Sequence, residues 1–328
     1  MKKLFAGLLI ILILVMGISV LNAGCTEQPK KVHLVMGYIP NVQFAPWYVA
    51  LEKGFFQEAG LDVTMDYGKV NDVMRLLAAG KIDFAIAGGD EVIVARGQGI
   101  PVSYSMALYA RFPAVIVSLA DQQITSPVDL KGKSIGIPGF YGTNYIAIKA
   151  VLAGAGLKEN EVTIRPIGYT QVASLSERKV DAIVGFANNE PVQLRQQGLD
   201  INVINCDQYF DLVGHGVVTG SKAQKDPTLT RAFIQATLKG MEYALAHPEE
   251  TMQICQQYIP ELDATNSPVQ YQVLLESMQL WQSPTTQKHG LGYSAPQAWA
   301  KSQQLMYGWG MIPQTSPVED LVTNQFLR

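Results

Sequence analysis

From residue 32 onward, strand-like apolar runs alternate with segments of helical periodicity. In the first series the strand-like runs are 32–38, 61–67, 83–87, 102–108 and 114–119, and helical spacing covers 44–59, 70–79 and 91–98. Strands that alternate with helices of this length are typical of a parallel sheet covered by helices. The sequence therefore predicts an α/β fold.

A polar turn at 126–133 interrupts this alternation, and a second series follows. Its strand-like runs are 134–138, 162–166, 181–186 and 201–204, with helices at 143–155, 171–177 and 191–197. A return strand at 217–219 then leads into a helical tail that is interrupted at Pro248, Pro260, Pro284 and Pro296. We expect a two-lobed clamp in which 32–120 and 220–328 form lobe 1 with the tail, and 121–219 form lobe 2.

The N-terminal segment has the pattern of a secretory signal. Lys2 and Lys3 precede an uncharged, mostly apolar run over 4–21, and small residues follow. The 21–25 segment, Leu-Asn-Ala-Gly-Cys, resembles a bacterial lipobox, which implies a signal peptide at 1–24, lipidation of Cys25 and a tether at 25–31. Because the apolar run is just long enough to span a bilayer, an uncleaved anchor is one alternative, and a released protein is another. Each alternative puts the globular part outside the cytoplasmic membrane.

Composition excludes several classes of function. The formal net charge of −3 disfavours nucleic acid, which requires a basic surface. The 3 cysteines and 4 histidines are scattered without metal-ligand spacing, so we expect neither a metal nor a cofactor. Cys206 and Cys255 could pair outside the cell, although spacing alone cannot establish a disulfide.

Four junctions between a strand and the following helix carry polar or glycine-rich residues, at 38–41, 88–91, 139–143 and 188–191. Ligands of open α/β sheets bind at the carboxyl ends of strands, where helix N-termini present free N–H groups. The polar residues that could contact a ligand here are Asn41, Gly89, Asp90, Gly142, Thr143, Asn188, Asn189 and Glu190. Each junction taken singly could equally be an ordinary helix cap. Two junctions fall in each lobe, so the set predicts a site between the lobes.

Aromatic residues lie at or beside the same junctions, namely Tyr38, Phe44, Trp47, Tyr109, Tyr141 and Tyr169. Aromatic walls with a few directional polar groups are typical of a pocket for a flat heterocycle, although Phe44 could also belong to the core. Catalysis has little support, because the chain has no G-x-S-x-G elbow and no histidine near a junction. We expect Asp90 and Glu190 to bind ring N–H or amino groups rather than to act as acid and base.

Several ordered motifs resemble one family of solute-binding proteins. They are Gly-Tyr-Ile-Pro-Asn at 37–41, the segments 50–56 and 58–63, Leu-Ala-Ala-Gly-Lys-Ile-Asp-Phe at 77–84 and Pro-Val-Asp-Leu-Lys-Gly-Lys at 127–133. The family serves nitrate-, sulfonate- and taurine-type ABC importers and includes binders of thiamine pyrimidine precursors and of riboflavin. The resemblance implies a type II periplasmic-binding-protein clamp, a permease and an ATPase as partners, and ligand contacts from the matching junctions, with Trp47 among them.

Segments 40–46 and 188–192 look most like the riboflavin-binding members. The resemblance therefore implies an extracytoplasmic, lipid-anchored binding protein for riboflavin, and not an enzyme. A hydroxymethylpyrimidine-type thiamine precursor is the first alternative and a sulfonate or nitrate the second. Acidic junctions without Lys or Arg disfavour small anions. The remaining alternative is a pyrimidine-synthesising enzyme, whose fungal representatives use a Cys-rich motif and a histidine that this chain does not match.

Overall fold

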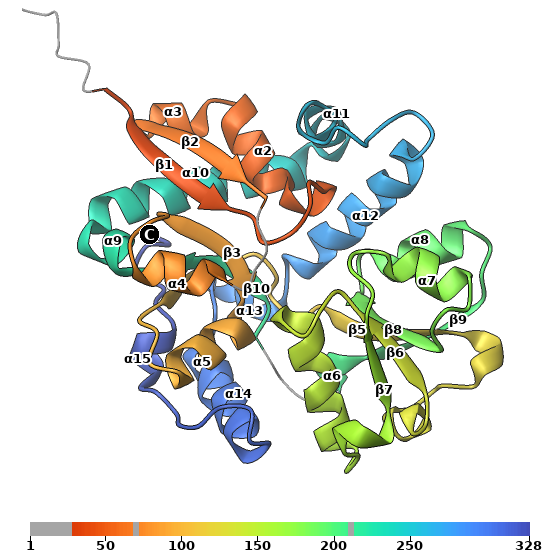
Figure 1. Cartoon of the computed structure of the whole chain (residues 1–328). Helices are drawn as coiled ribbons and strands as arrows, with labels where there is room; N and C mark the ends of the chain where they lie inside the picture. The colour runs from red at the N-terminus through yellow and green to blue at the C-terminus, as the bar shows by residue number, and fades with distance from the viewer. Residues whose placement is uncertain (1–27, 68–71, 209–212) are drawn as a thin grey trace, which may run out of the picture.

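Two lobes, each built on a five-stranded sheet, make up the molecule (Figure 1). The computed structural model describes residues 28–67, 72–208 and 213–328. The predicted signal peptide and Cys25 lie outside the described residues. Among the described helices, none combines the length and the apolar composition needed to cross a membrane.

Each sheet is mostly parallel and contains one antiparallel strand. In spatial order, the first sheet consists of β2 (Leu61–Asp66), β1 (Lys30–Val35), β3 (Phe84–Gly88), β10 (His215–Thr219) and β4 (Ser103–Ala107). The second consists of β7 (Thr163–Pro166), β6 (Ser134–Ile137), β8 (Ala182–Phe186), β5 (Ala114–Leu119) and β9 (Ile201–Asn205). β10 runs antiparallel to β3 and β4, and β5 runs antiparallel to β8 and β9.

The two antiparallel strands correct the lobe boundaries expected from the sequence. β5 was expected in lobe 1 but pairs within the second sheet, and β10 was expected in lobe 2 but pairs within the first. The chain therefore crosses between lobes after β4 and after β9. The polar turn at 126–133 is a surface feature of the second lobe and contains a short 3-10 helix at Pro127–Leu130. An apolar run such as β5, buried along its whole length, can pair with either sheet, so only long-range contacts decide its lobe.

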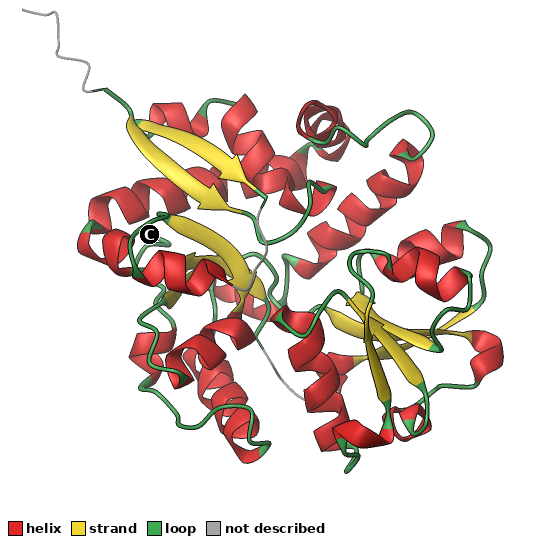
Figure 2. Ribbon diagram, in the orientation of Figure 1, coloured by secondary structure: helices red, strands yellow, loops and turns green. Residues whose placement is uncertain are grey.

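Helices cover both sheets, as Figure 2 shows. Those of the first lobe are α2 (Ala45–Glu52), α3 (Phe55–Glu58), α4 (Val73–Ala78), α5 (Gly89–Gly97), α9 (Ser221–Lys225), α10 (Pro227–Ala246), α11 (Pro248–Tyr258), α12 (Ser267–Leu280), α13 (Pro284–His289), α14 (Pro296–Gly308) and α15 (Val318–Leu321). Those of the second lobe are α6 (Gly142–Gly154), α7 (Gln171–Ser176) and α8 (Glu190–Gln196). The 3-10 segments are Val42–Phe44, Ala120–Gln122, Pro127–Leu130, Glu159–Glu161 and Cys206–Gln208.

Glycine and proline residues mark several of the helix boundaries. The helical pattern expected over 44–59 is split into α2 and α3, because Gly54 adopts a left-handed conformation with φ of 73°. Pro248, Pro284 and Pro296 are each the first residue of a helix, where the missing N–H group has no intrahelical partner to lose. The interruptions predicted at these three prolines are thus confirmed.

The long helix α10 ties the C-terminal part of the chain to the first lobe. Its N-cap, Asp226, accepts a hydrogen bond from the backbone N–H of Leu229 at 2.9 Å. Gly240 lets α10 approach α2 closely, since a Cβ atom there would lie 2.1 Å from the carbonyl oxygen of Pro46. Cys206 and Cys255 are both buried and free, so the disulfide that their sequence permitted does not form.

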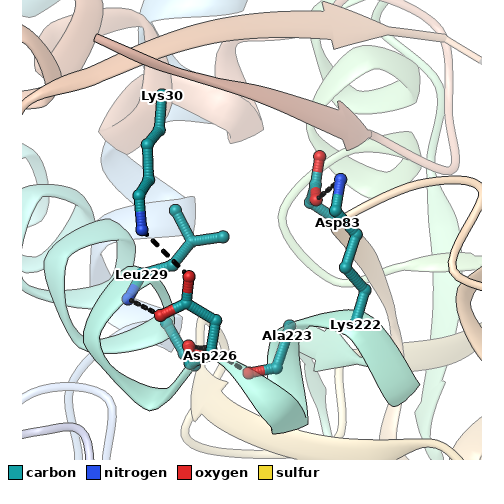
Figure 3. Close-up of polar contacts among 7 residues, drawn as sticks. Lys30, Asp83, Lys222, Ala223, Asp226 and Leu229 are labelled. Carbon is teal, nitrogen blue, oxygen red and sulfur yellow. Dashed lines mark hydrogen bonds and ion pairs between the residues drawn. The ribbon is translucent and has the colours of Figure 1, made fainter. Parts of the chain in front are cut away.

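Two ion pairs fasten the start of the helical tail to the strands of the first lobe (Figure 3). Lys30 Nζ lies 3.0 Å from Asp226 Oδ2, and Lys222 Nζ lies 2.6 Å from Asp83 Oδ1. Asp83 is buried, and its second carboxylate oxygen accepts the backbone N–H of His33 at 2.8 Å. This carboxylate therefore joins β1, the start of β3 and α9.

Replacing Asp83 by Ala should lower the free energy of unfolding by about 1–3 kcal/mol, because the partly buried N–H of His33 would lose its acceptor. Lys222→Ala should lower it by less than about 1 kcal/mol, because the lysine side chain is mostly exposed. Urea unfolding followed by circular dichroism measures both. Equal losses in the two variants would show that the ion pair, and not the backbone hydrogen bond, carries the stabilisation.

Candidate functional site

A cavity open to solvent lies between the two lobes, and its free space, counted together with the solvent at its mouth, is about 750 Å³. It lies at the carboxyl ends of β1, β3, β6 and β8, where each strand leads toward the following helix. We call it the cleft cavity.

Nine of the residues expected to contact a ligand line the cleft cavity. They are Tyr38, Phe44, Tyr109, Tyr141, Gly142, Thr143, Tyr169, Asn189 and Glu190. Both lobes contribute, and Tyr38 of the first lobe meets Tyr169 of the second edge to face, with ring centroids 4.8 Å apart. The cavity is therefore bounded by aromatic rings from both lobes.

The other five expected residues are not on this wall. Asn41 lines a groove on the solvent side of the cavity, and its side chain accepts the backbone N–H of Gln43 as a helix cap. Trp47 is fully buried in the core of the first lobe. Gly89 packs where a Cβ atom would lie 2.1 Å from Val213, so a side chain is excluded there by packing. Asp90 and Asn188 lie buried behind the wall.

Asp90 and Thr143 join the lobes directly. The hydroxyl of Thr143 at the start of α6 donates to Asp90 Oδ1 at the start of α5, over 2.9 Å. Gly88 makes the contact possible, because a Cβ atom at that position would lie 2.0 Å from Asp90 Oδ1 and 2.3 Å from Thr143 Oγ1. The role of Asp90 in this structure is to hold the two helix starts together.

Asn188 makes a second connection between the lobes. Its amide donates to Gln43 Oε1 at 3.0 Å and to Ser277 Oγ at 2.7 Å, both in the first lobe, and lies 3.2 Å from Tyr109 Oη. Tyr109 in turn donates to Gln43 Oε1 at 2.7 Å. This buried network sets the position of Tyr109, which forms part of the cavity wall.

Two carboxyl groups, Glu91 and Glu190, face the cleft cavity from opposite lobes. Glu91 Oε2 accepts the backbone N–H of Gly88 at 2.8 Å, and Glu190 Oε2 accepts that of Phe186 at 2.7 Å. Burial raises the pKa of Glu190 to about 7, although the hydrogen bond from Phe186 opposes the shift. Burial also raises the pKa of Glu91, and the neighbouring carboxylate of Asp90 raises it further. Near neutral pH such groups can offer either a donor or an acceptor to a ligand.

His215 corrects the expectation that no histidine lies near the site. It lines the cleft cavity from β10, with its ring 5.0 Å from that of Phe186, and burial lowers its pKa to about 4. Its Nδ1 has no hydrogen-bond partner among the described residues. A neutral imidazole in this position can donate to or accept from a bound molecule. The sequence pattern missed it because it begins an antiparallel strand that returns from the other lobe.

Other lining residues also escaped the sequence analysis, among them Gln43, Asn144, Gln171 and Phe186. Gln171 is the first residue of α7, and Phe186 is the last of β8, so both could have been found by extending the search to every strand end and helix start. Gln43 offered no such signal, because its position depends on the buried network with Asn188.

Comparison with known proteins places this geometry in context. A family model described as NMT1/THI5 like matches residues 41–251. The chain belongs to the NMT1/THI5-like family. It is 39% identical over 310 residues to the riboflavin-binding protein RibY of Chloroflexus aurantiacus, covering 93% of this chain and 88% of that protein. It is 30% identical over 267 residues to the formylaminopyrimidine-binding protein of Halalkalibacterium halodurans, covering 79% of each.

The family also contains proteins named as enzymes. One is the 4-amino-5-hydroxymethyl-2-methylpyrimidine phosphate synthase of Legionella pneumophila, 26% identical over 242 residues, which cover 71% of this chain and 75% of the relative. Among solved structures, the periplasmic aliphatic sulphonate-binding protein SsuA of Escherichia coli superposes with a TM-score of 0.68 at 13% identity, over 90% of this chain and 92% of that one. The type II clamp expected for this NMT1/THI5-like chain is confirmed.

The raised pKa of Glu190 predicts a pH-dependent stability. An unfolded glutamate titrates near 4.5 and the folded one near 7, so between these values the folded protein binds more protons and its stability falls as pH rises. His215, with its lowered pKa, acts in the opposite direction, so the comparison must be made against a variant. We expect the wild type to lose stability relative to Glu190→Gln between pH 4.5 and 7 in urea unfolding. If the unfolding free energies of the two proteins change with pH in parallel, the raised pKa of Glu190 is contradicted.

Proposed function

We propose that this protein is an extracytoplasmic substrate-binding protein of an ABC importer and that its ligand is riboflavin. The observation that carries the proposal is the cleft cavity itself: aromatic rings from two lobes, with Glu91 and Glu190 facing inward. No lysine or arginine is among the described residues that line it. Rings suit a flat heterocycle, and carboxyl groups suit its N–H donors. Riboflavin is favoured over other heterocycles by the 39% identity to a protein named as a riboflavin binder.

Binding, followed by closure of the lobes, is the mechanism we infer. The contacts between Asp90 and Thr143 and between Asn188 and Gln43 hold the lobes together, and both lie beside the cavity. A ligand that touches both lobes adds contacts available only when they are together, and therefore shifts the population toward that arrangement. A permease and its ATPase would then receive the loaded clamp.

The cavity supports capture better than catalysis. Among the described residues that line it, burial raises the pKa of Glu91 and of Glu190, and each of these carboxyls accepts a backbone N–H group. The hydroxyl of Thr143 donates to Asp90 in a contact that joins the starts of α5 and α6. Cys206 and Cys255 are buried in different apolar clusters. Among the described residues no group of three or more metal-ligating side chains comes together.

A pyrimidine precursor of thiamine is the second candidate. The 30% identity to a protein named for formylaminopyrimidine favours it. A single substituted pyrimidine ring presents the same kind of donors to Glu91 and Glu190 but is much smaller than the three-ring flavin. It would fill less of the cleft cavity and touch fewer of the rings contributed by the two lobes.

Thermal unfolding with riboflavin, an aminopyrimidine thiamine precursor or taurine in excess distinguishes these ligands. A ligand present at 100 times its dissociation constant stabilises the folded form by about 2.7 kcal/mol, which raises the unfolding midpoint measurably. We expect riboflavin alone to do so. A shift with the pyrimidine alone would favour the second candidate, and a shift with taurine would contradict the argument from charge.

Glu190→Ala should weaken riboflavin binding by about 1–3 kcal/mol, because buried ring donors would lose their partner. Titration calorimetry measures the loss. Glu177→Ala is the matched control, since Glu177 is an exposed residue at the end of α7 in the same lobe. Unchanged affinity in Glu190→Ala would remove that residue from the site without touching the choice of ligand.

We also propose that the protein is anchored to the membrane by a lipid on Cys25, as its lipobox-like segment indicates. Cys25→Ala should abolish incorporation of labelled palmitate in a bacterial host. It should also reduce the share of the protein that sediments with the membranes. Both proteins are expressed at equal levels with labelled palmitate, and we expect the label on the wild type and not on the variant. Incorporation that persists in the variant would contradict the lipid anchor and favour another attachment.

A further inference from the structure

The cleft cavity continues outward into a second hollow, which differs from it in chemistry. We call this the outer groove. Five residues border both hollows: Tyr38, Tyr169, Gln171, Asn189 and Glu190. The outer groove has more exposed walls than the cleft cavity, including Ile39, which is 45% exposed. A molecule larger than the cavity can therefore extend from one hollow into the other along a shared wall.

The outer groove is lined largely by uncharged hydrogen-bonding side chains. They include Thr170, Ser176, Gln193, Gln197, Asn266 and Gln270. The two lobes face one another here, with Gln193 and Gln197 from α8 and its end, and Gln270 from α12. A side-chain amide both donates and accepts hydrogen bonds, and so does a hydroxyl group. The amides of the outer groove therefore suit a ligand chain that carries several hydroxyl groups.

Not all of these amides are free to bind. Gln193 Nε2 already donates to Asn189 Oδ1 at 2.8 Å, and Asn266 Nδ2 donates to the carbonyl oxygen of Glu261 at 2.7 Å. Within the described parts of the chain, the side-chain amides of Gln197 and Gln270 have no hydrogen-bond partner. These two are the groups best placed to take up a ligand's hydroxyls without breaking an existing contact.

The acidic side chains of the outer groove disfavour a negatively charged group on the ligand's hydroxyl chain. The acidic side chains bordering the outer groove are Glu190 and Glu261, and no lysine or arginine borders it among the described residues. A phosphate at the end of the ligand's chain would lie beside carboxylates and find no cation. Phosphate binding normally relies on Lys, Arg or a helix N-terminus. The helices that begin beside the outer groove, α7 and α8, are only 6 and 7 residues long, and α8 has the carboxyl of Glu190 in its first turn.

We propose that the outer groove is a subsite for an uncharged polyhydroxyl chain attached to the ring held in the cleft cavity, and that it excludes the phosphate ester of the same molecule. The inference rests on the proposed function and extends it. The ring lies in the cleft cavity, and the chain lies outward between α8 and α12. Recognition of the chain depends on Gln197 and Gln270.

Three ligands test the subsite by calorimetric titration of the purified protein: riboflavin, lumiflavin, which has a methyl group in place of the chain, and flavin mononucleotide, which has a phosphate on it. We expect riboflavin to bind at least about tenfold more tightly than either of the others. Gln197→Ala and Gln270→Ala should each weaken riboflavin binding about three- to tenfold and leave lumiflavin binding unchanged. Gln224→Ala, on the exposed side of α9, is the control for non-specific effects.

The outcomes separate the subsite from the proposed function. Equal affinity for riboflavin and lumiflavin, or equal losses for both ligands in the two glutamine variants, would overturn the subsite while leaving riboflavin as the ligand. Tight binding of flavin mononucleotide would overturn the exclusion of phosphate. Failure of the wild type to bind riboflavin and lumiflavin alike would remove the proposed ligand and the subsite together.

Discussion

Among the described residues, one carbonyl group joins the two segments on which the chain passes between the lobes. The backbone N–H groups of Leu108 and Tyr109 both donate to the carbonyl oxygen of His215, at 2.9 and 3.0 Å. Gly214 allows this approach, since a Cβ atom there would lie 2.6 Å from the carbonyl oxygen of Arg111. Because Tyr109 and His215 also line the cleft cavity, the connection between the lobes forms part of the ligand site. Rotation of one lobe against the other must change that wall.

The polar groups of the site are held by the backbone rather than by opposite charges. Glu91 and Glu190 each accept a backbone N–H from a residue three or four positions earlier in the chain, and Asp90 accepts the hydroxyl of Thr143 from the other lobe. A buried carboxylate without a cation is costly unless it is hydrogen-bonded or protonated. The raised pKa values express this balance. The cavity has these carboxyls and no described lysine or arginine along its wall, which suits an uncharged heterocycle better than an anion.

Local patterns identified most of the elements and four of the junctions that surround the site. The alternation of apolar runs and helical spacing is a property of neighbouring residues, so strands such as β6 and β8 could be recognised without knowing their partners. Residues at the ends of parallel strands collect at one edge of a sheet, which brought Thr143 and Glu190 into the prediction. Trp47, by contrast, satisfied the family pattern and the expectation of an aromatic wall, yet it packs in the core because α2 turns that ring inward.

The sequence by itself determined the fold class, the order of the elements and the aromatic and acidic character of the site, because these depend on periodicity, turn chemistry and residue type. Only the tertiary structure decided which sheet receives β5 and β10, that His215 and Gln43 line the cavity, and that Asp90 and Asn188 connect lobes. β5 and β10 each pair with strands that are far away in the sequence. The apolar residues of a buried strand are compatible with either sheet, so local sequence cannot choose between them. The continuity of the cleft cavity with the outer groove likewise arises only where α8 and α12 approach one another from different lobes.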